Sequence, residues 1–368
     1  MIFFSIILFL CTVILMTISI LFIQFLNQNS ETKISTSSTQ IKISIIVAAK
    51  NEETNIENLL HSLSKLNYPN NSFEVIVVDD ESKDSTADIV QNYIKEFSNF
   101  KLISSSGKPY PAKKGALSVG IKKSKFDYIL TTDADCVVPP NWLSIASRYF
   151  EKGSDIIFGL TPYLCEELSE KNNNLVNRIS SFERFRGQLL TFLFAKLKSP
   201  YSAGGGNFGF KKSAFLKIEG YENTLQTLSG DDDLLINEAV KYQLKITPIL
   251  NSDFFVKTDS PKTWKEYFKQ RARHTATSIY YRKEIQTTLA LWHFSNIIIL
   301  FSPLGLIINW IFIIPIIIKL TIDILITKYL SKSFDYSFNF LSIIPLQIFY
   351  ELLLIIHFIN SFTRKKKW

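Results

Sequence analysis

Apolar residues gather at the two ends of the chain, and a stretch of mixed polar and apolar residues separates them. Residues 1–26 carry no charged side chain, and the first one in the chain is Glu31. Such a run is long enough to cross the roughly 30 Å hydrocarbon core of a bilayer as one helix. A secretory signal peptide would carry Lys or Arg near its start and would end at a small-residue cleavage site. The pattern therefore predicts an uncleaved membrane anchor over residues 1–26.

A second apolar region covers residues 289–360 and predicts two or three further spans. Its first block, residues 289–326, is too long for one crossing. Hydrophobic length alone therefore favours three spans after the polar middle. The basic tail at residues 361–368 favours the cytoplasmic side, and a cytosolic middle domain then requires an even number. A re-entrant or interfacial segment within residues 289–326 would reconcile these two arguments.

The middle of the chain alternates strand-like and helix-like patterns. Residues 27–40 are rich in Ser, Thr and Asn and predict a linker. Across residues 41–260, short apolar runs predict strands, and apolar residues at helical spacing predict helices. The expected strands are 43–47, 73–78, 101–104 and 128–132, and the expected helices are 53–66, 85–97 and 113–122. This alternation predicts an α/β domain with a mostly parallel sheet, in which ligands bind beyond the carboxyl ends of the strands.

Acidic residues follow three of these four predicted strands. Glu52 comes after the first strand, Asp79 and Asp80 after the second, and Asp133 and Asp135 after the fourth. Carboxylates gathered at one sheet edge repel each other unless a positive group compensates. Hard oxygen ligands suit Mg²⁺ or Mn²⁺, which commonly bridge carboxylates to substrate phosphates. A single Asp-x-Asp is usually only solvated, so the prediction depends on the ordered combination.

Other motifs have both a structural and a chemical interpretation. Asp84 or Ser85 could cap the helix that follows Asp80. Lys113 opens a predicted helix, where it could meet a phosphate or simply be solvated. The small residues 202–209 allow close approach of the backbone to a ligand. Gly230-Asp231-Asp232-Asp233 precedes an apolar helical pattern, which puts these acids at a helix N-terminus, where one could act as a general base.

The charge and cysteine content of the chain limit the cellular compartment and the partners that we expect. The chain has 41 Lys and Arg against 33 Asp and Glu, and three widely separated cysteines. An odd number of separated cysteines indicates a reducing compartment rather than a disulfide scaffold. Residues 261–285 interleave aromatic and basic side chains. Nucleic-acid binding is one interpretation, but the adjacent apolar region favours an interfacial helix lying on anionic lipid. We therefore expect membrane lipid, and no nucleic acid, as a partner.

Together these motifs resemble the membrane-embedded family 2 glycosyltransferases related to hyaluronan, chitin and cellulose synthases. The similar segments are Ile45–Glu53, Val77–Ser82 with Asp84, Lys113 with Ala116-Leu117, Thr132–Asp135, Gly230–Asp232 and Gln270–His274. Glu81 replaces the usual Gly of the Asp-Asp-Gly-Ser motif. His274 stands where Trp is usual, and that Trp helps processive synthases hold the acceptor sugar. The resemblance therefore does not imply long-chain polymerisation.

The resemblance implies a GT-A fold, with a mixed sheet of about seven strands, and metal-dependent inverting transfer from a nucleotide sugar such as a UDP-sugar. The resemblance also implies that the nucleotide-sugar site and the Mg²⁺ or Mn²⁺ site share residues. It further implies that Gln270, Arg271 and Arg273 lie on the acceptor or interface side. The donor residues would be Glu52, Asp79, Asp80, Lys113 and Asp133, and the metal ligands Asp135 and Asp133. In the family pattern the base lies three residues before a Leu. Leu235 then selects Asp232, whereas Leu234 would select Asp231.

Three functions follow from these features. The first is sugar transfer to a membrane-associated glycan or lipid, by an integral membrane enzyme whose catalytic domain is cytoplasmic. The second is transfer to a lipid carrier such as polyprenyl phosphate. The third is a non-catalytic membrane scaffold, which the intact acidic motifs disfavour. A transporter is also disfavoured, because the charged side chains in the two most apolar C-terminal blocks are only Lys319, Asp323 and Glu351.

Overall fold

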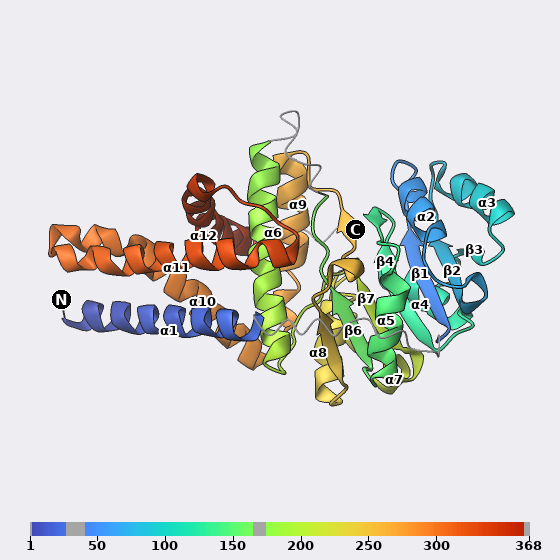
Figure 1. The fold of residues 1–368 in the computed structure, drawn as a ribbon, viewed down its shortest axis with the longest axis horizontal. Coiled ribbons are helices and arrows are strands. Elements are labelled where there is room, and N and C mark those ends of the chain that lie inside the picture. Colours follow the sequence, from blue (N-terminus) through green and yellow to red (C-terminus); the bar gives the residue numbers. More distant parts are fainter. Residues whose placement is uncertain (1, 27–40, 165–173, 364–368) are drawn as a thin grey trace. The chain divides into compact units, whose positions relative to one another are not determined.

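The computed structural model describes residues 2–26, 41–164 and 174–363, and the chain forms two compact units (Figure 1). Within the described residues, the sheet unit comprises 41–164 and 194–259. The helical unit comprises residues 2–26, 174–193 and 260–363. The expected domain of residues 41–260 thus encloses a segment, residues 174–193, that clusters with the helices.

The sheet unit is built on seven strands in the order β3-β2-β1-β4-β7-β6-β8. Strands β1 to β4 are parallel, β7 is antiparallel to both β4 and β6, and β8 is parallel to β6. The predicted mixed, mostly parallel sheet is therefore confirmed. The strands are β1 (Ile43–Ala49), β2 (Phe73–Asp79), β3 (Phe100–Ser104), β4 (Tyr128–Asp133), β6 (Ile156–Gly159), β7 (Phe208–Lys211) and β8 (Ile246–Ile249), and a separate pair joins β5 (Cys136–Val137) to β9 (Lys257–Thr258).

The strands form where the sequence is continuously apolar, because both faces of the sheet are covered. Ile45 and Val47 of β1 and Val75 of β2 are fully buried. Helix α2 places Ile56, Leu59, Leu60 and Leu63 in the same core, at the helical spacing that predicted them. Each such side chain contributes about 1.5–3 kcal/mol relative to exposure. The helices of this unit are α2 (Ile56–Ser64), α3 (Thr86–Glu96), α4 (Ala112–Lys123), α5 (Trp142–Glu151), α7 (Lys212–Lys217) and α8 (Asp233–Lys241), with 3-10 turns at Asn70–Ser72, Glu222–Thr224 and Ser252–Phe254.

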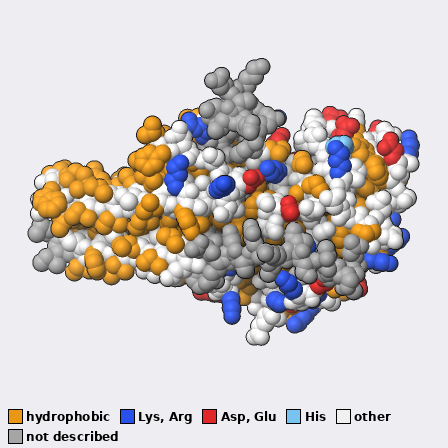
Figure 2. All heavy atoms as spheres, viewed as in Figure 1, with side chains coloured by type: hydrophobic (Ala, Val, Ile, Leu, Met, Phe, Trp, Pro, Cys, Tyr) orange, Lys and Arg blue, Asp and Glu red, His pale blue; other side chains and the backbone are white. Residues whose placement is uncertain are grey.

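The helical unit turns apolar side chains outward. In the face shown in Figure 2, hydrophobic side chains cover the region of the helices that Figure 1 labels α1 and α11. Four stretches of the described chain are long and apolar enough to cross a membrane: Phe3–Gln24, Lys283–Ile307, Trp310–Leu330 and Phe340–His357. The helices are α1 (Ile2–Leu26), most of α6 (Leu175–Lys196), α9 (Trp264–Thr275), α10 (Lys283–Phe301), α11 (Ile314–Leu330) and α12 (Phe340–Thr363), with 3-10 turns at Ser278–Tyr280, Ser302–Ile307, Trp310–Ile313 and Lys332–Phe334.

The basic and aromatic segment expected as one helix over residues 261–285 is divided in the structure. Helix α9 starts after Thr263, whose hydroxyl accepts a hydrogen bond from the Glu266 amide at 3.2 Å. The Glu266 carboxylate accepts one from the Lys262 amide at 2.9 Å. This reciprocal cap fixes the start of the helix. Helix α9 ends at Thr275, and α10 begins at Lys283, earlier than the apolar block expected from residue 289.

Candidate active site

The carboxyl ends of β1, β2 and β4 bring the predicted acidic residues to one edge of the sheet. In the parallel register, Ala49 pairs with Asp79 and Ala48 pairs with Asp133. The loops that follow β1 and β2 are also joined, since the Asn51 amide donates to the Ser82 hydroxyl at 3.0 Å. The sequence prediction that these strand ends share one edge is therefore confirmed.

Lys113, the second residue of α4, is the centre of this edge. Its amine lies 2.6 Å from Asp133 Oδ1 and 2.7 Å from Asp231 Oδ2. Burial alone would lower the pKa of Lys113, but the two carboxylates outweigh burial and raise this pKa well above its ordinary value. The amine therefore stays charged and links the strand-end acids to those that precede α8.

The three consecutive acids at the start of α8, Asp231, Asp232 and Asp233, have different environments. Asp231 pairs with Lys113, and that cation overcomes the effect of burial and lowers the pKa of Asp231. Asp233 accepts hydrogen bonds from the Ser202 hydroxyl at 2.6 Å and from the Ala203 amide at 3.1 Å. Burial, followed by the charges of Asp233 and Asp231, raises the pKa of Asp232 well above its ordinary value. A proton-accepting role thus suits Asp232 best of the three, because its proton affinity is raised.

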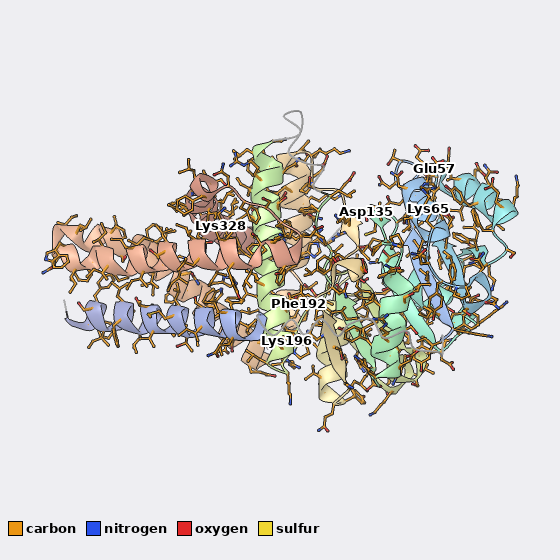
Figure 3. The ribbon with its side chains drawn as sticks, in the orientation of Figure 1. Glu57, Lys65, Asp135, Phe192, Lys196 and Lys328 are labelled. Atoms are coloured by element: carbon orange, nitrogen blue, oxygen red, sulfur yellow. The ribbon has the colours of Figure 1, made fainter. Side chains whose placement is uncertain are left out.

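A candidate metal site lies just beyond β4. One ligand atom from each of Asp133, Asp135 and Cys136 falls within 4.8 Å of the others. Asp135 is exposed past the end of the strand (Figure 3). Burial first, and then Asp135 and Asp133, raise the pKa of the Cys136 thiol well above its ordinary value. Cys136 was not among the predicted ligands, although it directly follows Asp135 in the sequence.

The remaining predicted donor residues differ in their burial. The Asp80 side chain is buried and accepts hydrogen bonds from the Ser105 hydroxyl, at 2.6 Å, and from Lys108. Burial alone would raise its pKa, but Lys108 and Ser105 prevail and lower it. Asp79 accepts a bond from the Ser82 amide at 3.3 Å.

Glu52 completes the predicted donor set. Burial raises the pKa of its carboxyl group, and the charges of Asp135 and Asp133 add to the rise. The carboxyl group of Glu52 therefore interacts electrostatically with the acids that follow β4.

Two local predictions about backbone and capping can be checked here. Asp84 Oδ1 accepts a hydrogen bond from the Thr86 amide at 3.1 Å, so Asp84, rather than Ser85, caps α3 with its side chain. Glu81, which replaces the family's Gly, has a φ of 60°. This left-handed conformation is the one that glycine adopts without strain. The turn is therefore kept although its usual residue is absent.

The small residues at 202–209 form a packed segment that faces the acids. A Cβ atom built on Gly205 would lie 3.2 Å from Asp232 Oδ2, and one built on Gly206 would lie 2.8 Å from Cys136 Sγ. Asn207 is fully buried, and its side-chain oxygen accepts a hydrogen bond from Trp142 Nε1 at 2.9 Å. Side chains at these two glycines would therefore fill the space beside the acids.

The structure does not gather every predicted residue in this unit. Gln270, Arg271 and Arg273 lie on α9 of the helical unit, where Arg271 Nε is 3.1 Å from Glu183 Oε2. Conversely, Lys108 and the buried Lys114 were not predicted. Lys114 donates hydrogen bonds to the carbonyls of Thr224 and Thr227. Lys114 could have been found from the sequence, because it stands in the Lys-Lys pair at the start of α4. No local pattern distinguishes Lys108.

Comparison with known proteins identifies the domain that contains this edge. Residues 44–218 match the family model for "Glycosyl transferase family 2". A beta-monoglucosyldiacylglycerol synthase of Trichormus variabilis is 38% identical over 110 residues, covering 30% of this chain and 24% of the relative. "Probable glycosyltransferase YdaM" of Bacillus subtilis is 27% identical over 250 residues, covering 63% of this chain and 54% of the relative. The chain thus spans about a quarter to about half of the length of these curated relatives.

A solved structure shares the fold over nearly the whole chain. The mannosyltransferase PcManGT from Pyrobaculum calidifontis, determined in complex with GDP-Man and Mn²⁺, superposes with a TM-score of 0.61 at 15% identity. The match covers 97% of this chain and 99% of that chain. At this identity the likeness establishes the fold, which is GT-A. We conclude that this chain carries a glycosyltransferase family 2 domain.

Proposed function

We propose that the chain is an inverting glycosyltransferase that moves a sugar from a nucleotide-sugar donor to a membrane-associated glycan or lipid. The observation that carries this proposal is the position of Lys113 between Asp133 and Asp231, the residue that immediately precedes Asp232 in the chain. Lys113 thus links the acids at the carboxyl ends of the strands, where we place the donor, to the acids at the start of α8. A base and a donor site must be neighbours if one is to activate the nucleophile that attacks the other.

The donor side would use the strand-end residues. Asp79 or Asp80 would hold the nucleobase, Glu52 would lie on the nucleoside side, and Lys113 and Asp133 would meet the ribose or base. In support, Asp80 is kept ionised by Lys108 and Ser105, so it can accept hydrogen bonds from a base. A UDP-sugar is the donor that the family resemblance favours.

The chemistry of the acidic group suits a divalent cation. Asp133 and Asp135 offer hard carboxylate oxygens close together, and the accumulated negative charge at this edge leaves room for a positive partner. Mg²⁺ or Mn²⁺ bound by Asp135 and Asp133 would neutralise the diphosphate leaving group. Cys136 lies close enough to be a third neighbour of the ion.

The acceptor side would use Asp232 as the general base, with Asp231 as the alternative. Asp232 would take the proton of the acceptor hydroxyl while that oxygen attacks the anomeric carbon. The new oxygen–carbon bond forms as the bond from that carbon to the diphosphate breaks, and the configuration inverts. Its raised pKa supports proton acceptance, and the glycines at 205 and 206 leave space beside it.

The acceptor is expected at a membrane. Four stretches of the described chain can cross one, and α9 presents exposed Trp264, Lys265 and Arg273 that suit an anionic lipid surface. On this view Gln270, Arg271 and Arg273 serve the acceptor or interface side. We place the sheet unit in the cytoplasm, because Lys33 and Lys42 follow the first apolar helix. A reporter fused at Ser37 should give a cytoplasmic signal, and an extracytoplasmic signal would invert the topology.

The names of relatives support two acceptor classes. One is a beta-monoglucosyldiacylglycerol synthase, and another is a poly(ribitol-phosphate) beta-N-acetylglucosaminyltransferase of Staphylococcus aureus. A lipid acceptor, which includes the alternative of polyprenyl phosphate, agrees with the apolar helices. Incubating the protein in membranes with a radiolabelled nucleotide sugar and partitioning the product into organic solvent distinguishes them. Label in the organic phase indicates a lipid acceptor, label in insoluble polymer indicates a glycan, and label in neither contradicts transfer.

A further inference from the structure

Helix α12 buries both polar and apolar side chains on its inner side and exposes apolar side chains on its outer side. The polar side chains of Gln347, Glu351 and His357 are buried. The large hydrophobic side chains exposed on the opposite face are Leu341, Phe349, Leu352, Ile356 and Ile359. A continuous apolar face of this length is rarely left in water by a soluble protein. The outer face of α12 therefore needs an apolar neighbour.

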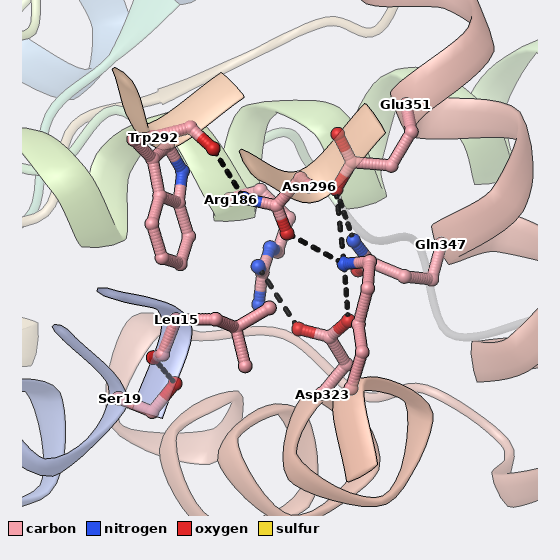
Figure 4. Close-up of polar contacts among 9 residues, drawn as sticks. Leu15, Ser19, Arg186, Trp292, Asn296, Asp323, Gln347 and Glu351 are labelled. Carbon is pink, nitrogen blue, oxygen red and sulfur yellow. Dashed lines mark hydrogen bonds and ion pairs between the residues drawn. The ribbon is translucent and has the colours of Figure 1, made fainter. Parts of the chain in front are cut away.

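The buried polar side chains attach α12 to α11 through an ion-pair network (Figure 4). Lys319 of α11 lies 3.2 Å from Glu351 and 2.8 Å from Asp323. Arg186 of α6 also pairs with Asp323, at 3.1 Å. Gln347 donates to Glu351 at 2.8 Å. Each carboxylate thus has a cation, which is what a charge buried among apolar helices requires.

A second attachment joins α12 to α6 and α9. His357 Nε2 lies 3.4 Å from Glu183 Oε1 and 2.9 Å from the Tyr267 hydroxyl. Ile343, Leu346 and Tyr350 of α12 pack in one apolar cluster with residues of α6 and α9. The inner face of α12 is therefore held at two places along its length.

The direction of α12 differs from that of the other apolar helices in this unit. Helices α1 and α11 are seen from the side in Figure 1, whereas α12 is seen nearly end-on. Helix α1 packs against both α10 and α11. A helix that runs across these three cannot cross the same bilayer beside them, although its length and composition would allow a span.

We propose that α12 lies in the plane of the membrane, with its outer face on the acyl chains of one leaflet, so that only α1, α10 and α11 cross. Lys328 in the last turn of α11 and Lys332 in the 3-10 turn that follows are both exposed, and they suit the headgroup layer where α12 would start. The inference rests on the membrane association proposed above. It leaves two crossings after the sheet unit, so the basic tail returns to the side of that unit. The interfacial segment is then α12, rather than a part of residues 289–326.

Depth measurements along α12 test this arrangement. Spin labels would be placed singly at Leu341, Phe349 and Ile359 in the full chain, after Cys11, Cys136 and Cys165 are replaced by Ser. The protein would be reconstituted in phosphatidylcholine vesicles, and depth read from collisions with oxygen and a water-soluble nickel complex. From Leu341 to Ile359 the helix axis is about 27 Å long. An in-plane helix gives three closely similar depths.

Control labels at Ile314 and Leu325 on the exposed face of α11 should differ in depth, because about 16 Å of helix separates them. A graded profile along α12, with Phe349 deepest and its two ends at opposite surfaces, would overturn the proposal. Dipolar broadening between labels that oxygen cannot reach would also overturn the proposal. In that case a second copy of the protein, rather than lipid, would cover the outer face of α12. A tag after Trp368 should be accessible from the same side as one at Ser37, and the opposite result would also overturn it.

Discussion

Charged side chains are buried in both units, but their balance differs. At the edge of the sheet unit, Lys113 bridges Asp133 and Asp231, while burial, followed by the charges of Asp233 and Asp231, raises the pKa of the neighbouring Asp232. In the helical unit, Asp323 pairs with Arg186 and Lys319, and Glu351 pairs with Lys319. In the first group one lysine bridges two of three neighbouring carboxylates, whereas in the second group each carboxylate has a cationic partner.

This difference separates a reactive site from a scaffold. Excess charge of one sign costs stability and is retained where a ligand or a proton compensates it. A balanced buried network costs desolvation, but it can fix which helices meet. Substitutions at the sheet edge should therefore change catalysis and leave the fold intact, and substitutions in the helical network should do the reverse.

The largest effect is expected for Asp135→Ala, which should reduce transfer to background while the protein remains folded. The reason is that the proposed cation loses a hard ligand that neutralises the leaving diphosphate. Calorimetry should also show weaker donor binding in Mn²⁺. Glu57→Gln, at an exposed acid of α2, is the matched control and should bind and react normally. Equal activity of the wild type in EDTA and in Mn²⁺ would refute the metal assignment.

Asp232→Asn keeps the shape of the side chain and removes the base, so turnover should fall by about 10² to 10⁴. Donor affinity should stay nearly unchanged, because the donor residues lie on other elements. Measuring kcat and donor Kd for Asp232→Asn and Asp231→Asn separates the two candidates. If Asp231→Asn is inactive and Asp232→Asn is not, the base has been placed one residue too late.

In the helical unit, Lys319→Met should destabilise the protein by about 3–5 kcal/mol, because Glu351 loses its cation inside an apolar bundle. Replacing both partners, as Lys319→Met with Glu351→Gln, should recover much of that loss. Thermal unfolding in detergent measures both variants. Donor binding by the folded fraction should be unchanged, and a selective loss of binding would mean that the network is part of the active site.

The smallest expected effect is a shift in pH dependence. Asp232 must be ionised to act as a base, and burial, Asp233 and Asp231 raise its pKa. The activity should therefore fall on acidification at a higher pH than an ordinary aspartate would give. Asp231→Asn removes one negative neighbour, so the acid limb should move to lower pH, by about one unit or less. The pH profile of kcat in both proteins checks this, and an unmoved limb would argue against Asp232.

The sequence was sufficient for features that depend on neighbours along the chain. Strand and helix patterns predicted β1 to β4 and the helices between them within a few residues, because burial on both sheet faces leaves a strong apolar signal. The acids Asp79 and Asp133 could be brought together from topology alone, since parallel strands end at one edge.

Features that depend on distant contacts could not be predicted. Lys108 reaches Asp80 from another loop, and no local pattern marks that pairing. Only the contacts of segment 174–193 show that it belongs with the helices. The direction of α12 also follows from its packing on α6, α9 and α11, because composition fixes length and polarity but not orientation.

The central claim is that the acidic edge of the sheet unit transfers a sugar from a nucleotide donor. The most direct test measures nucleoside diphosphate release from a panel of nucleotide sugars, with membranes as acceptor, for the wild type, Asp135→Ala and the double variant Lys319→Met with Glu351→Gln. The account predicts release from at least one donor by the wild type and the folded double variant, and none above background by Asp135→Ala. Equal release by the wild type and Asp135→Ala, or no release from any donor, would contradict it.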